Sequence, residues 1–353
     1  MNIPFTATQN PRKKPEDHNL SFGTQFTDHM FLMDYAPQKG WHDPRIVPYG
    51  DFSLPPSTAV LHYGQAIFEG LKAYRSKEGH IQLFRPKDNF ERFNRSAKRM
   101  CIPELDTAFA LQSLKELVRI EKDWVPSTRG TSLYIRPAII ATDPFLGVRA
   151  SHTYRFFIIL CPVGAYYAEG FNPVKIWVTK DYVRAVPGGV GEAKTAGNYA
   201  ASLYASEEAQ REGYTQVLWL DGKEHRYVEE VGSMNIFFVI DNTIVTPQLN
   251  GSILSGITRN TVLEMAKHKG LTVSERRISM DEICQAHKNG SLSEAFGSGT
   301  AAVISPVGTI RYGDEILTLR EGKAGPISSM LFDEITGIQY GEKQDPFHWV
   351  EKI

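Results

Sequence analysis

Cysteine is scarce in this chain, and the few cysteines form no disulfide or metal-binding pattern. Only Cys101, Cys161 and Cys284 occur in 353 residues, and no C-x-x-C pair is present. An odd, sparse set of thiols is typical of a reducing compartment, and without such pairs a structural zinc site has no support. The ten histidines form no HExxH or similar cluster. We therefore expect no metal site.

The sequence also lacks an excess of charge and a long apolar run. Lys and Arg total 39 against 40 for Asp and Glu, which argues against a dedicated nucleic-acid surface. No segment approaches the roughly 20 apolar residues that a membrane-spanning helix needs. The polar N-terminal stretch contains Glu16 and Asp17 and fits neither a signal peptide nor a mitochondrial transit peptide. We expect a cytoplasmic protein with neither nucleic-acid nor membrane partners.

What is present is an ordinary globular composition, with 42% hydrophobic residues and enough chain for two domains. Apolar patterning predicts strands at 81–84, 132–141, 154–161, 175–179, 216–220, 236–240 and 243–246. It predicts helices at 88–100, opened by Asp88, and at 108–122, 198–212 and 257–269. The expected fold class is α+β or mixed α/β. The predicted organisation is a flexible arm at 1–20, a small N-terminal α+β domain at 21–163, a linker at 164–175 and a large C-terminal domain at 176–353.

A glycine-rich stretch, VPGGVGEAKTAGN at 186–198, surrounds Lys194 with small residues. Such a lysine can form a Schiff base with a cofactor aldehyde. The stretch is also close to the phosphate-binding pattern GxxxxGK[ST], with Asp221 after a later apolar strand as a metal ligand. Ala193 argues against that pattern, because alanine resists the backbone conformation that the replaced glycine adopts. A surface lysine in a glycine-rich loop is the third interpretation, and the stretch alone leaves all three open.

Six motifs taken together point to a known family. In chain order they are LHYGQAIFEG (61–70), SLYIRP (132–137), GGVGEAKTAGNY (188–199), EVGSMNIFFV (230–239), SGITRN (255–260) and FGSGTAAVISPV (296–307). From Phe22 to near its C-terminus the chain resembles branched-chain amino acid aminotransferases of PLP fold type IV. The resemblance implies a two-domain fold with pyridoxal 5'-phosphate between the domains. It also implies a homodimer.

The resemblance implies a set of cofactor-binding residues. Lys194 matches the lysine that forms the internal aldimine and moves the proton between substrate and cofactor. Glu230 matches the carboxylate that pairs with the pyridine nitrogen, whose protonation makes the ring an electron sink. The phosphate is expected at Arg92 and at the N-terminal amides of a helix. The complete implied set is Lys194, Arg92, Tyr199, Glu230, Ser233, Ile257, Thr258 and Thr300.

The resemblance also implies a mainly apolar substrate pocket. Its aromatic positions are Phe22, Tyr63, Phe68, Tyr134 and Tyr166. A leucine side chain has no polar handle, so shape and desolvation select it.

Two polar groups are expected beside these aromatic side chains. The amides of Thr300 and Ala301 match the site for the α-carboxylate. Arg136, on the same strand face as Tyr134, can receive the side-chain carboxylate of glutamate. The C-x-x-C redox pair of some relatives is absent, because Ala302 and Ser305 occupy those positions.

These features predict a reversible ping-pong transamination of L-leucine, L-isoleucine or L-valine with 2-oxoglutarate. The products are the branched 2-oxo acid and L-glutamate. Three alternatives stay open: a D-amino-acid aminotransferase or aminodeoxychorismate lyase of the same fold, a P-loop nucleotide hydrolase that uses Lys194 and Asp221, and a non-catalytic relative. The aromatic set and Arg136 favour the branched-chain substrates.

Overall fold

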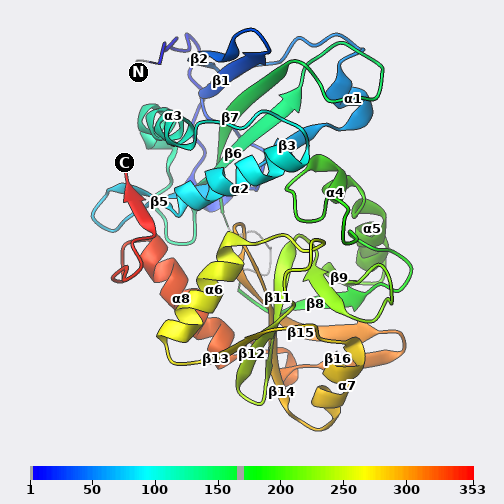
Figure 1. The fold of residues 1–353 in the computed structure, drawn as a ribbon. Helices are drawn as coiled ribbons and strands as arrows, with labels where there is room; N and C mark the ends of the chain where they lie inside the picture. The colour runs from blue at the N-terminus through cyan, green and yellow to red at the C-terminus, as the bar shows by residue number, and fades with distance from the viewer. Residues whose placement is uncertain (1–2, 165–170) are drawn as a thin grey trace. The chain divides into compact units, whose positions relative to one another are not determined.

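The computed structural model describes residues 3–164 and 171–353, and the chain divides into two compact units (Figure 1). Unit 1 comprises Met1–Tyr166, Ala193–Ala196 and Ile338–Ile353, and unit 2 comprises Tyr167–Glu192 and Gly197–Gly337. The predicted linker at 164–175 contains residues 165–170, which lie outside the described residues. The domain limits drawn from the sequence stay a prediction.

Unit 1 is built on one antiparallel sheet with the strand order β17-β5-β4-β6-β7-β1-β2, to which the short β3 is added beside β6. The two long central strands, β6 and β7, pair along ten residues. In both strands apolar residues either alternate with other residues or follow one another over that length. The strands are β1 His29–Ala36, β2 Gly40–Pro48, β3 Ala66–Phe68, β4 Leu71–Arg75, β5 Ile81–Phe84, β6 Ser132–Ala141, β7 Tyr154–Val163 and β17 Val350–Lys352.

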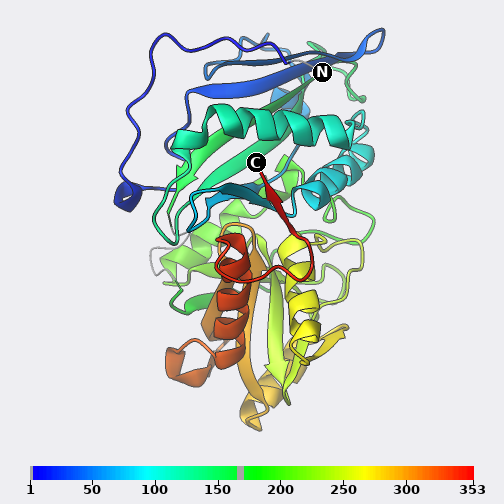
Figure 2. The ribbon, with the colours of Figure 1, turned by 90° about the vertical axis from the view of Figure 1, so that its left-hand side faces the viewer.

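Helices α2 (Pro86–Arg99) and α3 (Thr107–Ile120) cover one face of this sheet (Figure 2). Phe90 and Phe93 from α2 and Leu114 from α3 join Phe156 and Leu160 of β7 in one buried core. Asp106 caps α3 by accepting the N–H of Phe109 at 2.9 Å. The short helices of this unit are α1 Ala59–Tyr63, η1 Asp17–Asn19 and η2 Lys122–Trp124.

The predicted helices at 108–122 and 257–269 match α3 and α6 (Ile257–His268) within two residues at each end, whereas two other predictions differ more from the structure. Helix α2 begins at Pro86 rather than Asp88, because proline suits the first helical position and Arg85 takes the left-handed conformation before it. The predicted helix at 198–212 is two helices, α4 (Ala196–Ala200) and α5 (Leu203–Arg211). The turn between them tightens, since both the N–H and the hydroxyl of Ser202 donate to the carbonyl of Tyr199.

The described part of the N-terminal arm follows the surface of unit 1. The N–H of Thr6 donates to the carbonyl of Ile46 at 2.9 Å, and Arg12 donates to the carbonyl of Phe26 at 3.0 Å. Asp17 accepts the N–H groups of Ser127 and Thr128 at 2.9 and 2.8 Å. The flexibility predicted for residues 1–20 stays a prediction.

Unit 2 contains a sheet that closes on itself. Its path β10-β9-β8-β15-β14-β11 returns from β11 to β10, which also pair, while β12, β13 and β16 extend it. Pairs β8–β9, β8–β15 and β12–β13 are parallel, and the others are antiparallel. The strands are β8 Val174–Val178, β9 Gln216–Leu220, β10 Val228–Val231, β11 Met234–Ile240, β12 Thr243–Thr246, β13 Thr272–Glu275, β14 Leu292–Gly299, β15 Val303–Tyr312 and β16 Glu315–Thr318.

The core of unit 2 lies between this closed sheet and the helices around it. Ile236 and Phe238 of β11 and Ile310 of β15 are fully buried with Met280 and Ile283 of α7. The remaining helices are α6 Ile257–His268, α7 Met280–Lys288, α8 Pro326–Gln339 and η3 Arg320–Gly322. In the part of the chain that the structure describes, no helix is both long and apolar enough to cross a membrane.

Candidate active site

Lys194 belongs to unit 1, where both of its backbone hydrogen-bonding groups are held. Its N–H donates to Oγ of Ser96 at 2.9 Å, and its carbonyl accepts the N–H of Phe68 at 3.0 Å. The hydroxyl of Thr195 donates to the carbonyl of Ala66 at 2.7 Å. The half-buried Lys194 side chain places Nζ 5.1 Å from the centre of the Phe68 ring. Helix α2 and strand β3 therefore fix the position of this lysine.

A buried ion pair lies next to this lysine. Arg92 donates from Nε to Oε1 of Glu69 at 2.7 Å and from Nη2 to Oε2 at 2.8 Å. Asn89 donates to Oε2 at 2.8 Å, and Glu69 has no exposed surface. Burial alone would raise the pKa of Glu69, but the positive charges of Arg92 and Lys194 hold it below its usual value. The two-point contact orients the guanidinium of Arg92, the predicted phosphate ligand.

Arg136 is held among aromatic side chains of the same unit. Its Nη2 donates to the Tyr134 hydroxyl at 3.0 Å, and its guanidinium carbon lies 4.5 Å from the centre of the Phe68 ring. The ring of Phe22 packs edge-on against Tyr134, 4.9 Å between centres. Nε of Arg136 is buried and has no hydrogen-bond partner. The structure thus brings together Phe22, Phe68, Tyr134 and Arg136, four of the predicted substrate residues.

Gly70 makes room for this arrangement. A Cβ atom at Gly70 would collide with the hydroxyl of Tyr134. The thiol of Cys161 lies against the backbone amides of residues 23–25; burial raises its pKa, while these amides oppose the shift. The close packing of Gly70 against Tyr134 and of Cys161 against residues 23–25 therefore belongs to the surroundings of Arg136.

Two other predicted substrate residues are placed differently. Tyr63 ends helix α1, its side chain is exposed, and its hydroxyl donates to the carbonyl of Leu146. Leu61, two residues before Tyr63, and Val148, two residues after Leu146, also have exposed side chains. Tyr166 lies outside the described residues. The substrate role of both tyrosines stays a prediction.

In unit 2, Glu230 is a buried carboxylate with partners on both oxygens. Oε1 accepts Nδ2 of Asn235 and the N–H of Leu254, each at 3.1 Å. Oε2 lies 2.6 Å from Nε of Arg184, whose side chain is 8% exposed. The neighbouring Glu229 accepts Nδ2 of Asn250 at 3.1 Å and the Ser252 hydroxyl. The two adjacent glutamates therefore hold successive parts of the loop at 250–254.

The N-terminus of α6 follows this loop and suits a phosphate. Gly256 is the N-cap and supplies no side chain to the first N–H groups of the helix, which include those of Ile257 and Thr258. A Cβ at Gly256 would collide with Oδ1 of Asn235, the residue that also contacts Glu230. Glycine thus leaves the amides open and lets the helix end approach the carboxylate.

Three other predicted residues of unit 2, Ser233, Thr300 and Ala301, lie in turns at the same end of the closed sheet. Ser233 is in the turn between β10 and β11, and Thr300 and Ala301 are in the turn between β14 and β15. The pairing of Asn235 with Ser298 places these two turns side by side. Tyr199 lies in α4, which Asn198 ties to the glycine-rich stretch by donating to the carbonyl of Val190 at 2.8 Å.

Asp221, the metal ligand of the P-loop alternative, is engaged by backbone groups. Its carboxylate accepts the N–H groups of Lys223, Glu224, Arg226 and Tyr227 at 2.8–3.2 Å. These bonds hold its pKa below the usual value, although burial acts in the opposite direction. Asp221 therefore closes a turn after β9.

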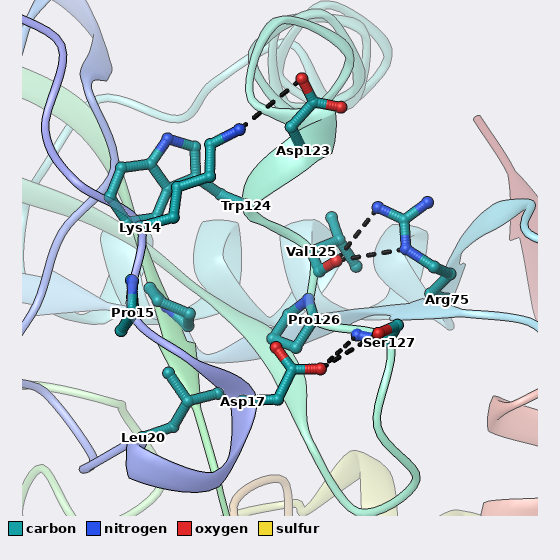
Figure 3. Close-up of a pocket in the computed structure, with 11 residues that line it drawn as sticks. Lys14, Pro15, Asp17, Leu20, Arg75, Asp123, Trp124, Val125, Pro126 and Ser127 are labelled. Atoms are coloured by element: carbon teal, nitrogen blue, oxygen red, sulfur yellow. Dashed lines mark hydrogen bonds and ion pairs between the residues drawn. The ribbon is translucent and has the colours of Figure 1, made fainter.

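A pocket of about 390 Å³ in unit 1 lies apart from the predicted residues (Figure 3). The polar residues that line it form hydrogen bonds and ion pairs with one another. Asp17 accepts a hydrogen bond from Ser127, Lys14 lies 3.6 Å from Asp123, and Arg75 donates to the carbonyl of Val125. None of the predicted site residues that the structure describes lines this pocket. It is not part of the candidate active site.

Four residues around the site were missed by the sequence analysis: Glu69, Ser96, Arg184 and Asn235. Glu69 and Asn235 stand inside motifs that were recognised, so position in the motif was an available signal. Ser96 and Arg184 lie outside all six motifs, and only their contacts identify them.

The comparisons with known proteins identify the family of this chain. The amino-transferase class IV family model matches residues 66–310. Branched-chain-amino-acid aminotransferase 2 of Bacillus subtilis (strain 168) is 59% identical over 353 residues, which cover 100% of this chain and 97% of that protein.

Solved structures extend the agreement to the fold. The branched-chain amino acid aminotransferase of Escherichia coli has a TM-score of 0.78 at 29% identity, covering 92% of this chain and 98% of that one. The branched-chain amino acid aminotransferase of Thermobaculum terrenum in its PLP form has a TM-score of 0.74 at 25% identity, covering 91% and 97%. The predicted family and PLP fold type IV are therefore confirmed. With a family model over most of its length and a relative matching all of it, this chain belongs to the class IV aminotransferases.

Proposed function

We propose that this protein is a branched-chain-amino-acid aminotransferase, which transfers the amino group of L-leucine, L-isoleucine or L-valine to 2-oxoglutarate. The structural observation that carries the proposal is Lys194, held by Ser96 and Phe68 beside the buried Glu69–Arg92 pair. The full-length identity to a Bacillus subtilis enzyme of that name supports the choice of substrate class.

The proposed cofactor is pyridoxal 5'-phosphate. When bound, it supplies an aldehyde that joins an amine and a ring that accepts electrons from the substrate Cα. The Thermobaculum terrenum relative was solved in its PLP form, which supports this assignment. The donor set fits the group, because the glycine-capped α6 offers open amides for a phosphate and Glu230 offers a buried carboxylate for a ring nitrogen.

Within this proposal each residue has a chemical role. Lys194 binds the aldehyde carbon and afterwards moves the proton at the substrate Cα. Arg92, Ile257, Thr258 and Thr300 bind the phosphate, and Glu230 holds the proton on the ring nitrogen. Tyr199 donates to the ring oxygen, and Ser233 lines the same site.

Substrate choice follows from the residues around Arg136. Phe22, Phe68 and Tyr134 present apolar surface, so a branched aliphatic side chain is selected by shape and desolvation. Nε of Arg136, buried without a partner, offers a donor for the side-chain carboxylate of glutamate or 2-oxoglutarate. The amides of Thr300 and Ala301 bind the α-carboxylate. We further propose a cytoplasmic homodimer, with Tyr63 and Tyr166 in the substrate pocket.

The absorption spectrum of the purified protein tests this proposal. We expect a visible band from the lysine-bound cofactor that bleaches with leucine and returns with 2-oxoglutarate. Lys194→Ala removes the amine, so its band should differ and the cycle should stop. Lys87→Ala, at an exposed lysine of α2, is the matched control and should behave as wild type. A wild-type protein that stays colourless when pyridoxal phosphate is supplied contradicts the proposal.

A further inference from the structure

Arg184 is a buried cation to which the roles above assign nothing. Its Nε lies 2.6 Å from Oε2 of Glu230, and the two side chains are 8% and 5% exposed. The Nε–H group has no acceptor in hydrogen-bonding geometry, so the contact is an ion pair rather than a directed bond. Two charges this close and this buried interact strongly, because water screens them little.

A second nitrogen of the same guanidinium binds backbone. Nη2 donates to the carbonyl of Gly191 at 3.2 Å and to the carbonyl of Ser252. Gly191 precedes Lys194 in the glycine-rich stretch, and Ser252 precedes the N-cap Gly256. A Cβ at Gly191 would collide with the Ser252 carbonyl, so the close approach of these segments requires glycine. One side chain therefore joins the carboxylate to both neighbouring loops.

The two oxygens of Glu230 are in different electrostatic surroundings. Oε1 accepts two neutral donors, from Asn235 and Leu254, whereas Oε2 faces the charge of Arg184. A cation next to a carboxylate favours its ionised form and lowers its affinity for a proton. Without a compensating charge, a buried carboxylate tends to become neutral.

We propose that Arg184 is a positioning residue for the ring end of the cofactor. It keeps Glu230 ionised and in place, and it limits how strongly Glu230 holds a proton on the ring nitrogen. The inference rests on the proposed function, in which Glu230 pairs with that nitrogen. Arg184 acts only through Glu230 and through the carbonyls of Gly191 and Ser252.

The test is ¹⁵N NMR of the holoenzyme loaded with cofactor labelled at the ring nitrogen, recorded across the pH range in which the protein is stable. In Arg184→Gln we expect the pH at which this nitrogen loses its proton to rise by about one unit, a tenfold change in proton affinity. In Glu230→Gln it should fall. A purely structural role of Arg184 predicts no such opposite shifts, and an unchanged titration in Arg184→Gln overturns the proposal.

A second variant keeps the test decisive if Arg184→Gln does not fold. Arg184→Lys preserves the charge, but one ammonium cannot reproduce the planar contacts to Glu230 and to two carbonyls. We expect its dissociation constant for pyridoxal phosphate to rise roughly tenfold. Arg226→Lys, at an exposed ion pair with Asp281, should leave that constant unchanged.

Wild-type affinity in Arg184→Lys overturns the positioning role. A wild-type protein that takes up no labelled cofactor overturns the proposed function itself, and is recognised before any variant is compared.

Discussion

At the scale of single residues, the arrangement of the side chains around Arg136 requires a glycine at position 70. Gly70 has no Cβ, and the hydroxyl of Tyr134 occupies the space where one would be. That hydroxyl accepts the hydrogen bond that orients Arg136. The backbone conformation of Gly70 is one that other residues can adopt, so its importance is steric rather than conformational.

Gly70→Ala should therefore disturb the acidic substrate more than the apolar one. The new methyl group displaces the Tyr134 hydroxyl and removes the Arg136 hydrogen bond, which is worth about 1 kcal/mol or more. We expect KM for 2-oxoglutarate to rise about fivefold or more, with a smaller change in KM for leucine. Gly50→Ala, where a Cβ meets nothing within 4 Å, is the control. Equal effects on both substrates in steady-state assays would contradict this role of Tyr134.

At this scale the sequence pointed to candidate site residues, but it did not show which other residues contact them. Lys194 and Glu230 were predicted as site residues because each stands inside a specific motif. Arg92 was predicted as a phosphate ligand, but its pairing with Glu69, 23 residues away, required the structure. A residue's own type is visible in the sequence, whereas the charge that it meets depends on folding.

At the scale of elements, α2 connects two parts of the site. Its buried face carries Arg92 and, one turn later, Ser96. Arg92 contacts Glu69, and Ser96 accepts the backbone N–H of Lys194. The helix therefore sets the distance between the guanidinium and the lysine segment.

Ser96→Ala should loosen this connection. The N–H of Lys194 would be left without its acceptor in a largely buried position, at a cost of about 1–3 kcal/mol. We expect a lower thermal midpoint and weaker binding of pyridoxal phosphate, measured by unfolding and by equilibrium dialysis. The matched control is Ser113→Ala on α3, whose buried hydroxyl donates only to the carbonyl of Phe109 in its own helix. Cofactor affinity that falls equally in both variants would argue against a specific role of Ser96.

Seven strands were predicted from the sequence, and four of them have the predicted limits, whereas ten other strands of the described residues were not predicted. The strands at 81–84, 132–141, 216–220 and 243–246 have the predicted limits, because apolar runs and turn residues are local features. The predicted start of α2 and the predicted continuous helix at 198–212 were wrong. The backbone geometry at Arg85 decides the first, and that at Ser202 decides the second.

At the scale of the whole molecule, the buried Glu69 links folding to pH. Burial by itself would raise the pKa of Glu69, but Arg92 and Lys194 lower it below the usual 4.5. A carboxylate with a depressed pKa in the folded state stabilises the protein above its unfolded-state pKa. That contribution is lost as the pH falls below about 4.5 towards the folded-state pKa.

Glu69→Gln should therefore destabilise the protein at neutral pH by about 3–5 kcal/mol, because Arg92 stays buried without its compensating charge. The difference from wild type should shrink as the pH falls below 4.5, where wild-type Glu69 becomes protonated as well. Denaturant unfolding at several pH values measures both effects. Glu116→Gln, at an exposed pair with Arg119, should cost less than about 1 kcal/mol. A pH-independent difference for Glu69→Gln would rule out the linkage.

The sequence by itself determined the family and seven of the strands that the structure describes, and it predicted the role of Lys194, because motifs and apolar periodicity are properties of neighbouring residues. Only the tertiary structure decided which distant groups meet. Ser96 contacts Lys194 across 98 positions, Arg184 meets Glu230 from another loop, and β11 pairs with the distant β14 in the closed sheet. These contacts arise when buried charges and backbone groups must find partners inside the folded units, and that requirement leaves no periodic trace in the chain.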